Sequence, residues 1–264
     1  MIDLLKIKNI GIEAANKSEQ ILISYFGDLK TYEKKGSIDL VTRADKESEQ
    51  VIIDTILKAF PDHGVIAEES GMMRPDAENV WIIDPLDGTT NFAHGVPIYA
   101  ISIAFAVNGE TLFGIVYNPS MKELFIGEKG GGATLNGQPI SVSTTERLFD
   151  SLIVTGFPYS LHDRLPSLLN KFEIMLKHTQ GIRRLGAAAL DLCYVACGRF
   201  DGFWEQLLKP WDTAAGSLIA HEAGGAVTDF SNNRFNIDMK EILVTNGKIH
   251  NQVISLFAAG GKTS

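Results

Sequence analysis

The stretch Asp84-Pro85-Leu86-Asp87-Gly88-Thr89-Thr90 directly follows the apolar run Val80-Trp81-Ile82-Ile83. The run is typical of a buried strand, and Pro85 keeps the backbone of Asp84 extended. Asp84 is therefore expected where the strand ends, with Asp87 after a turn on the same side. Carboxylates bind hard divalent cations, and the free N–H groups of a helix start bind oxyanions. The stretch predicts a metal half-site beside a phosphate half-site at a short helix; taken alone, it also suits an Asp-rich turn with a helix cap.

Helix and strand patterns surround this stretch. Amphipathic helices are predicted over 3–26 and from Thr42 to Pro61, and a short strand over 65–67. A meander of strands is predicted over 99–107, 111–118 and 123–128, with Asn136-Gly137 as a further hairpin turn and Gly130-Gly131-Gly132 as a plain turn. Strands and helices then alternate over 152–155, 165–178, 187–198, 202–205, 213–223 and 242–245. The pattern predicts an N-terminal α+β half over 1–150 and a C-terminal α/β half over 151–264, packed together without a linker.

Composition limits the classes of function. The chain has 264 residues, of which 45% are hydrophobic, and a formal net charge of −8. This content suits a large core, and the acidic balance argues against nucleic acid bound on a basic surface. Met1 to Lys8 lack the apolar centre of a signal peptide, and no apolar run is long enough to span a bilayer. A cytoplasmic protein without a membrane partner is expected, with Cys193 and Cys197 as reduced thiols.

Three further acidic segments stand at the ends of predicted elements. They are Asp45 at a helix start, Glu68-Glu69 after a short strand, and Asp212 at the start of the helix over 213–223. Singly, each suits a helix cap or a solvated loop. Two such charges about 5 Å apart repel by about 3 kcal/mol at an effective dielectric of about 20. A fold that collects these acids in one cleft therefore needs divalent cations to neutralise them.

Longer motifs extend this pattern. Asp84 to Asn91 reads D-P-L-D-G-T-T-N, Trp211 to Gly216 reads W-D-T-A-A-G, and residues 221–225 read H-E-A-G-G. These segments resemble the two signatures of the inositol monophosphatase family, and residues 39–45 and 64–70 also fit its pattern. The resemblance covers nearly the whole chain in the family's order. It implies a layered αβαβα sandwich and a magnesium-dependent phosphomonoesterase.

The resemblance also implies two to three Mg²⁺ ions. Glu68, Asp84 and the carbonyl of Leu86 are implied to bind the first ion. Asp84, Asp87 and Asp212 are implied to bind the second, and a third, weaker ion is implied near Glu68. Such ions activate a water nucleophile and stabilise the leaving alkoxide, so no covalent phosphoenzyme is needed.

Asp45, Glu68 and Thr89 are the catalytic residues that the resemblance implies, with Thr89 hydrogen-bonded to Asp45 and orienting the water. Glu69 is implied to help orient the neighbouring ligands. Gly88, Thr89 and Thr90 are implied to bind the phosphate, and Asp87 and Asp212 are further substrate-binding residues that the resemblance implies.

The alcohol part of the substrate has its own implied contacts. The stretch that contacts inositol hydroxyls in the family is matched here by Gly186, Ala187, Ala188 and Glu205. Glu205 alone also suits an exposed carboxylate. Arg183 and Arg184 suit dimer contacts or salt bridges ahead of lining the site. Ala187 replaces a hydroxyl residue common in animal members, and the segment from Glu69 to Trp81 is short, so lithium sensitivity and substrate breadth stay open.

The function expected is Mg²⁺-dependent hydrolysis of myo-inositol 1-phosphate or a similar small polyol or sugar phosphate. The family also includes phosphatases of fructose 1,6-bisphosphate, nucleotide 3′-phosphates, NADP and histidinol phosphate. A binding protein of a transcription complex is the alternative from another class. A homodimer is expected from the resemblance alone.

Overall fold

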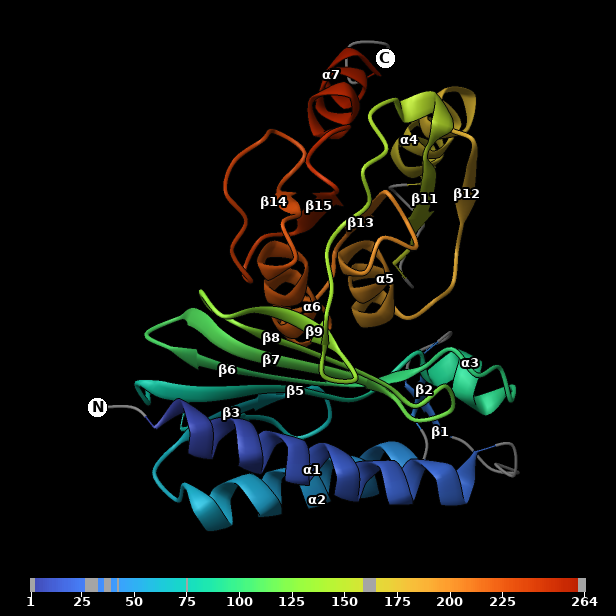
Figure 1. The fold of residues 1–264 in the computed structure, drawn as a ribbon. Coiled ribbons are helices and arrows are strands. Elements are labelled where there is room, and N and C mark those ends of the chain that lie inside the picture. Colours follow the sequence, from blue (N-terminus) through green and yellow to red (C-terminus); the bar gives the residue numbers. More distant parts are fainter. Residues whose placement is uncertain are drawn as a thin grey trace.

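The computed structural model describes residues 3–26, 33–35, 39–41, 43–74, 76–158 and 165–260. Five layers follow one another in Figure 1: a helix pair, a large sheet, a second helix pair, a small sheet and a third helix pair. The layered αβαβα sandwich expected from the sequence is therefore confirmed. Among the described residues, no helix combines the length and the apolar composition that a bilayer-spanning segment needs.

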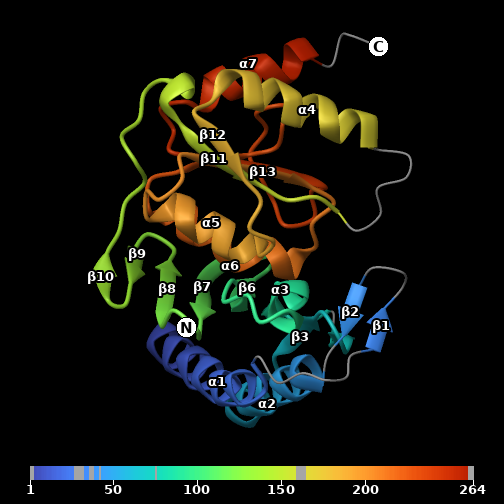
Figure 2. The ribbon, with the colours of Figure 1, turned by 90° about the vertical axis from the view of Figure 1, so that its right-hand side faces the viewer.

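Three pairs of helices form the first, third and fifth layers, the short helix Thr89–Ala93 lies at one end of the large sheet, and a 3₁₀ turn at Leu148–Asp150 precedes the small sheet. Their bounds are α1 (Leu4–Tyr25), α2 (Arg43–Ala59), α3 (Thr89–Ala93), α4 (Leu165–His178), α5 (Ala188–Ala196), α6 (Pro210–Glu222) and α7 (His250–Gly260). Figure 2 shows α1 and α2 under the large sheet, α5 and α6 between the sheets, and α4 and α7 over the small sheet.

The large sheet has eight strands in the order β10-β9-β8-β7-β6-β5-β3-β4. They are β3 (Gly64–Ala67), β4 (Gly71–Met73), β5 (Asn79–Asp87), β6 (Ala100–Val107), β7 (Glu110–Asn118), β8 (Glu123–Glu128), β9 (Gly132–Leu135) and β10 (Gln138–Pro139). The predicted meander is thus confirmed, and Asn136 and Gly137 close the β9–β10 hairpin with φ of 50° and 77°. Apolar side chains of α1 and α2 pack on one face of this sheet.

The small sheet has the order β12-β11-β13-β15-β14. Its strands are β11 (Leu152–Thr155), β12 (Gly181–Arg183), β13 (Gly202–Gln206), β14 (Ala226–Thr228) and β15 (Glu241–Thr245). The short strands β1 (Glu33–Lys35) and β2 (Asp39–Val41) pair separately. Thr42, the predicted helix start, lies outside the described residues, whereas α2 ends before Pro61 as expected.

Two glycines let α6 approach the large sheet closely. A Cβ atom on Gly114 of β7 would lie 2.9 Å from the Cα of Ala215, and one on Gly127 of β8 would lie 3.0 Å from the Cα of Ile219. Such contacts are too short for any side chain, so the bare backbone fixes the helix-to-sheet distance. The start of α6 carries Asp212, so this packing also positions an acid.

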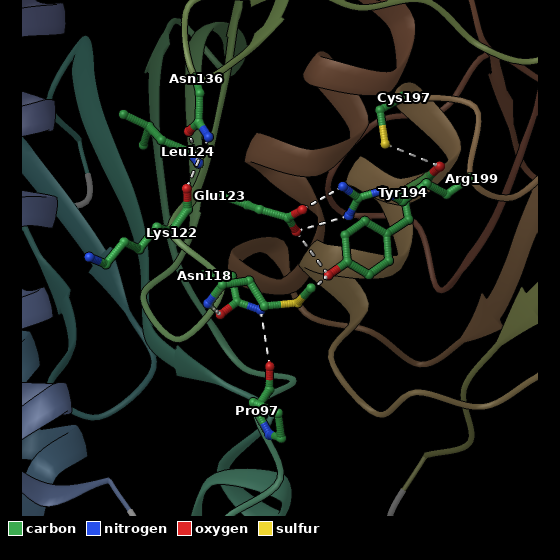
Figure 3. Close-up of polar contacts among 10 residues, drawn as sticks. Pro97, Asn118, Lys122, Glu123, Leu124, Asn136, Tyr194, Cys197 and Arg199 are labelled. Atoms are coloured by element: carbon green, nitrogen blue, oxygen red, sulfur yellow. Dashed lines mark hydrogen bonds and ion pairs between the residues drawn. The ribbon is translucent and has the colours of Figure 1, made fainter.

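An ion pair between the buried Glu123 and the exposed Arg199, which follows α5, joins the end of this helix to the large sheet (Figure 3). Glu123 of β8 accepts a hydrogen bond of 2.9 Å from Arg199 Nη1 and one of 3.2 Å from the hydroxyl of Tyr194. The Arg199 guanidinium also lies 4.7 Å from the ring centre of Tyr194. The C-terminal end of α5 is thereby tied to β8, while its other end reaches the cavity described below. Of the two free cysteines, Cys193 is buried and Cys197 is partly buried.

Candidate active site

A cavity of about 580 Å³ lies where the large sheet meets the starts of α3, α5 and α6. This volume is in the range of sites that bind small molecules. Most of the residues singled out from the sequence line it: Glu68, Asp84, Leu86, Asp87, Gly88, Thr89, Gly186, Ala187, Ala188, Glu205 and Asp212. Thr90, in the first turn of α3, is not among the lining residues.

Strand β5 does not end at Asp84, as the sequence predicted, but continues to Asp87. Its pairing with β6 shifts register between Asp84 and Asp87, which marks a bulge. Pro85 has no N–H to donate, so a bulge is one of the few places where a sheet tolerates it. Asp84 Oδ1 accepts a hydrogen bond of 2.9 Å from the N–H of Leu86 inside the bulge. Both carboxylates therefore reach the cavity from one strand.

Gly88 makes the turn from β5 into α3. Its φ is +88°, and a Cβ atom there would lie 2.9 Å from the carbonyl oxygen of Ile98. Both facts require glycine. The hydroxyl of Thr89 donates a hydrogen bond of 3.0 Å to the Leu86 carbonyl. The hydrogen bond between Thr89 and Asp45 that the resemblance implies stays a prediction.

Asp87 and Asp212 are held by backbone N–H groups at helix starts. Asp87 Oδ2 accepts a hydrogen bond of 2.7 Å from Ala189 in the first turn of α5. Asp212 Oδ2 accepts one of 2.6 Å from Lys209, the residue before α6. Helix starts favour negative charge, so each acid has a fixed position at low cost. Helix α6 begins at Pro210, three residues before the predicted start, which places Asp212 inside its first turn.

A second group of acids adjoins this one. Asp45, Glu68 and Glu69 each offer a carboxylate oxygen, and the three oxygens lie within 4.8 Å of one another. Only Glu68 of the three also lines the cavity. Glu68 therefore links both groups of acids.

Two buried residues of α2 support these segments and are missing from the sequence prediction. The carboxylate of Glu49 accepts hydrogen bonds of 2.8 Å from the N–H groups of Glu69 and Ser70. The hydroxyl of Ser48 donates one of 3.0 Å to the carbonyl of Pro85. Glu49 follows Asp45 by one helical turn, and that spacing on one helix face is the signal that points to it.

Burial and mutual repulsion raise the pKa values of the central acids. Burial is the main cause at Asp84, whose pKa lies well above its usual range, and Glu68 and Asp87 add to the shift. Burial raises the pKa of Asp87 to about 7, against the opposing hydrogen bond from Ala189. Burial also raises the pKa of Asp212 to about 7. In each case burial and the neighbouring negative charges outweigh the groups that favour the ionised form.

The other end of the cavity carries Glu205, with Asp191, Arg184 and Lys240 as polar neighbours. Asp191 was not predicted from the sequence. Both of its oxygens are buried, and neither has a hydrogen-bond partner among the residues that the structure describes. An acid inside the otherwise apolar helix α5 is the signal that could have identified it. Arg184 lines the cavity, the second of the two roles considered for it.

Known proteins are similar to this chain in sequence and in fold. The family model described as "Inositol monophosphatase family" matches residues 3–261. An inositol-1-monophosphatase of Synechocystis sp. is 45% identical over 262 residues, covering 97% of this chain and 90% of the relative. A protein of Escherichia coli (strain K12) named "Nus factor SuhB" is 44% identical over 226 residues, covering 84% and 85%. The solved structure of an inositol monophosphatase from Anabaena (Nostoc) sp. has a TM-score of 0.89 at 42% identity, covering 98% of this chain and 97% of that one.

The family model spans almost the whole chain, and the relatives named above are 42–45% identical to it over most of its length. The chain belongs to the inositol monophosphatase family.

Proposed function

We propose that the protein hydrolyses myo-inositol 1-phosphate, or a similar small polyol phosphate, with the help of Mg²⁺. The observation that carries the proposal is the set of acids at one cavity, which Glu68, Asp84, Asp87 and Asp212 line and which Asp45 and Glu69 adjoin through Glu68. The relatives named inositol-1-monophosphatase support the same reaction. A phosphatase of this kind needs only positioning and charge stabilisation, so the absence of an activated serine or cysteine from the predicted set is no obstacle.

The residues present fit hard divalent cations, because every donor in the set is oxygen. Glu68, Asp84 and the Leu86 carbonyl would hold one ion, and Asp84, Asp87 and Asp212 a second. The raised pKa values of these acids indicate a local excess of negative charge that cations would offset. Bound ions of this kind lower the pKa of water, neutralise phosphoryl oxygens and stabilise a leaving alkoxide. A third ion would fit between Glu68 and the carboxylates of Asp45 and Glu69.

The chain's own groups orient the reactants. Thr89 donates a hydrogen bond to the Leu86 carbonyl, which leaves its oxygen lone pairs able to accept a hydrogen bond from the attacking water and to orient it. Asp45 is the buried carboxylate that we propose as the acceptor of the proton that the water loses. Gly88 and Thr89 present N–H groups at the start of α3 to the phosphate. Glu205 lies at the far end, where it would accept a hydrogen bond from the alcohol.

The test is phosphate release by the purified protein. Inositol phosphates, fructose 1,6-bisphosphate, nucleotide 3′-phosphates and NADP would be compared as kcat/KM, with millimolar Mg²⁺ and after EDTA. We expect the highest value for an inositol phosphate and loss of activity in EDTA. No release from any of these esters with Mg²⁺ present would contradict the proposal.

The relative named "Nus factor SuhB" supports a second role as a binding protein in a transcription complex. A pull-down from cell extract with the intact protein, with and without Mg²⁺, tests it through recovery of RNA polymerase components. Recovery of none of them would leave hydrolysis as the only role. We also propose a cytoplasmic homodimer, for which sedimentation at two protein concentrations is the measurement.

A further inference from the structure

The carboxylate of Glu205 occupies the space that a side chain at position 156 would take. Strands β11 and β13 run parallel, with Thr155 opposite Trp204, so Gly156 and Glu205 are the next residues along each strand. A Cβ atom on Gly156 would lie 2.5 Å from Oε1 of Glu205 and closer still to Oε2. Gly156 is not in the left-handed region, so its backbone would accept alanine. A side chain at position 156 would therefore have to displace the Glu205 carboxylate.

No hydrogen bond anchors the Glu205 carboxylate. Burial is the main cause that raises its pKa, and none of the described residues donates a hydrogen bond to it. Glu205 is only 7% exposed, yet it lines the cavity. A buried carboxylate without donors is costly, so a donor from a ligand would be strongly favoured.

The charged residues around Glu205 limit which kind of ligand group can donate a hydrogen bond to its carboxylate. Asp191 lies on the same side of the cavity, and its own oxygens also lack partners. The charge of Arg184 acts on both carboxylates and offsets them only in part. Two carboxylates without donors therefore favour a ligand that brings hydroxyl donors to this end of the cavity, which Arg184 and Lys240 also line.

We propose that Gly156 is a specificity-determining residue: its bare Cα lets the Glu205 carboxylate face the cavity and accept a hydrogen bond from a hydroxyl group of a neutral polyol. The proposal rests on the proposed function, which supplies the ester. The Glu205 carboxylate, placed in this way, would favour phosphate esters of polyols over esters whose alcohol has no further hydroxyl group.

The first experiment compares kcat/KM for myo-inositol 1-phosphate with kcat/KM for phenyl phosphate, whose alcohol carries no further hydroxyl. In Gly156→Ala we expect the ratio of the two values to fall about tenfold, because one hydrogen bond to a charged group is lost. Gly181→Ala is the matched control, since a Cβ atom there would meet only ordinary contacts of 3.4 Å or more. An unchanged ratio in Gly156→Ala would overturn the proposal.

A double-mutant cycle tests whether Gly156 acts through Glu205. In the Glu205→Ala background, Gly156→Ala should leave the ratio unchanged, because the displaced carboxylate is gone. A tenfold loss that persists in this background would assign the effect to something other than Glu205.

A crystal structure of Gly156→Ala shows where the Glu205 carboxylate lies, and this readout does not depend on enzymatic activity. We expect the Glu205 carboxylate to have moved away from β11, and an unmoved carboxylate would refute the proposal. If the wild-type protein hydrolyses neither ester, the proposed function fails, whereas this structure still tests the role of Gly156.

Discussion

Asp87 connects two layers of the molecule through one side chain. It ends β5 in the large sheet and accepts a hydrogen bond from Ala189 at the start of α5. Asp87→Asn keeps the shape of the side chain and removes its charge. We expect turnover with Mg²⁺ to fall more than about a hundredfold, beyond the loss caused by removing an outer partner of a metal ligand. Steady-state kinetics measure this, with the exposed Asp54→Asn as control; equal turnover in both variants would contradict the metal assignment.

Leu207, in the cavity wall after β13, has a φ of 66°. The left-handed backbone conformation costs a residue with a Cβ atom about 1–2 kcal/mol. Such strain persists where the surrounding structure enforces it. Leu207→Gly should raise the free energy of unfolding by about 0.5–1 kcal/mol, since glycine's larger loss of chain entropy offsets part of the relief. Leu208→Gly, at a neighbouring residue without positive φ, should lower it. Denaturant melts of both variants decide the question, and destabilisation by both would mean that Leu207 is not strained.

At the scale of the element, α2 acts as a support for the acids. One face of this helix carries Asp45, Ser48 and Glu49, all of them buried, and Glu49 binds the backbone beside Glu68. Glu49→Gln replaces an acceptor of two N–H groups by an amide with one acceptor oxygen. We expect a 10- to 100-fold loss of turnover, roughly the effect of removing an outer-shell partner. Glu47→Gln, exposed on the same helix, should leave turnover unchanged, and an equal loss there would argue against a supporting role for Glu49.

Elements with clear periodicity were predictable from the sequence, whereas short or context-dependent ones were not. The predicted ranges over 152–155 and 165–178 coincide with β11 and α4. The predicted end of a strand at Asp84 was wrong, because Pro85 is accommodated by a bulge that depends on the pairing with β6. No local sequence pattern predicts such a bulge.

The acids of the site also divide into those that the sequence predicts and those that it does not. Those in motifs could be identified from the sequence, and among them Glu68, Asp84, Asp87 and Asp212 line one cavity. Glu49 and Asp191 escaped prediction because a single buried acid on a helix resembles an exposed one until the packing is known. Gly156 escaped it because its role depends on a carboxylate from another strand.

At the scale of the whole molecule, folding gathers negative charge that the unfolded chain keeps apart. Glu68 follows β3, Asp87 ends β5 and Asp212 starts α6, and each comes from a different part of the sequence. The two cores on either side of the large sheet hold these elements in place. Hydrophobic burial therefore opposes electrostatic repulsion at the cavity, and the balance depends on protons and cations.

This balance predicts how stability depends on pH in the protein stripped of cations by EDTA. Folding raises the pKa values of Asp87 and Asp212 from 3.8 to about 7. The folded state then binds more protons than the unfolded state between these values, so stability is greatest below pH 4 for these groups and is lost as pH rises through 7. The melting temperature in EDTA should therefore fall from pH 5 to pH 8. Millimolar Mg²⁺ should raise it more at pH 8, where the acids are ionised, than at pH 5. Scanning calorimetry measures both, and an equal effect of Mg²⁺ at the two pH values would show that these acids do not bind the ion.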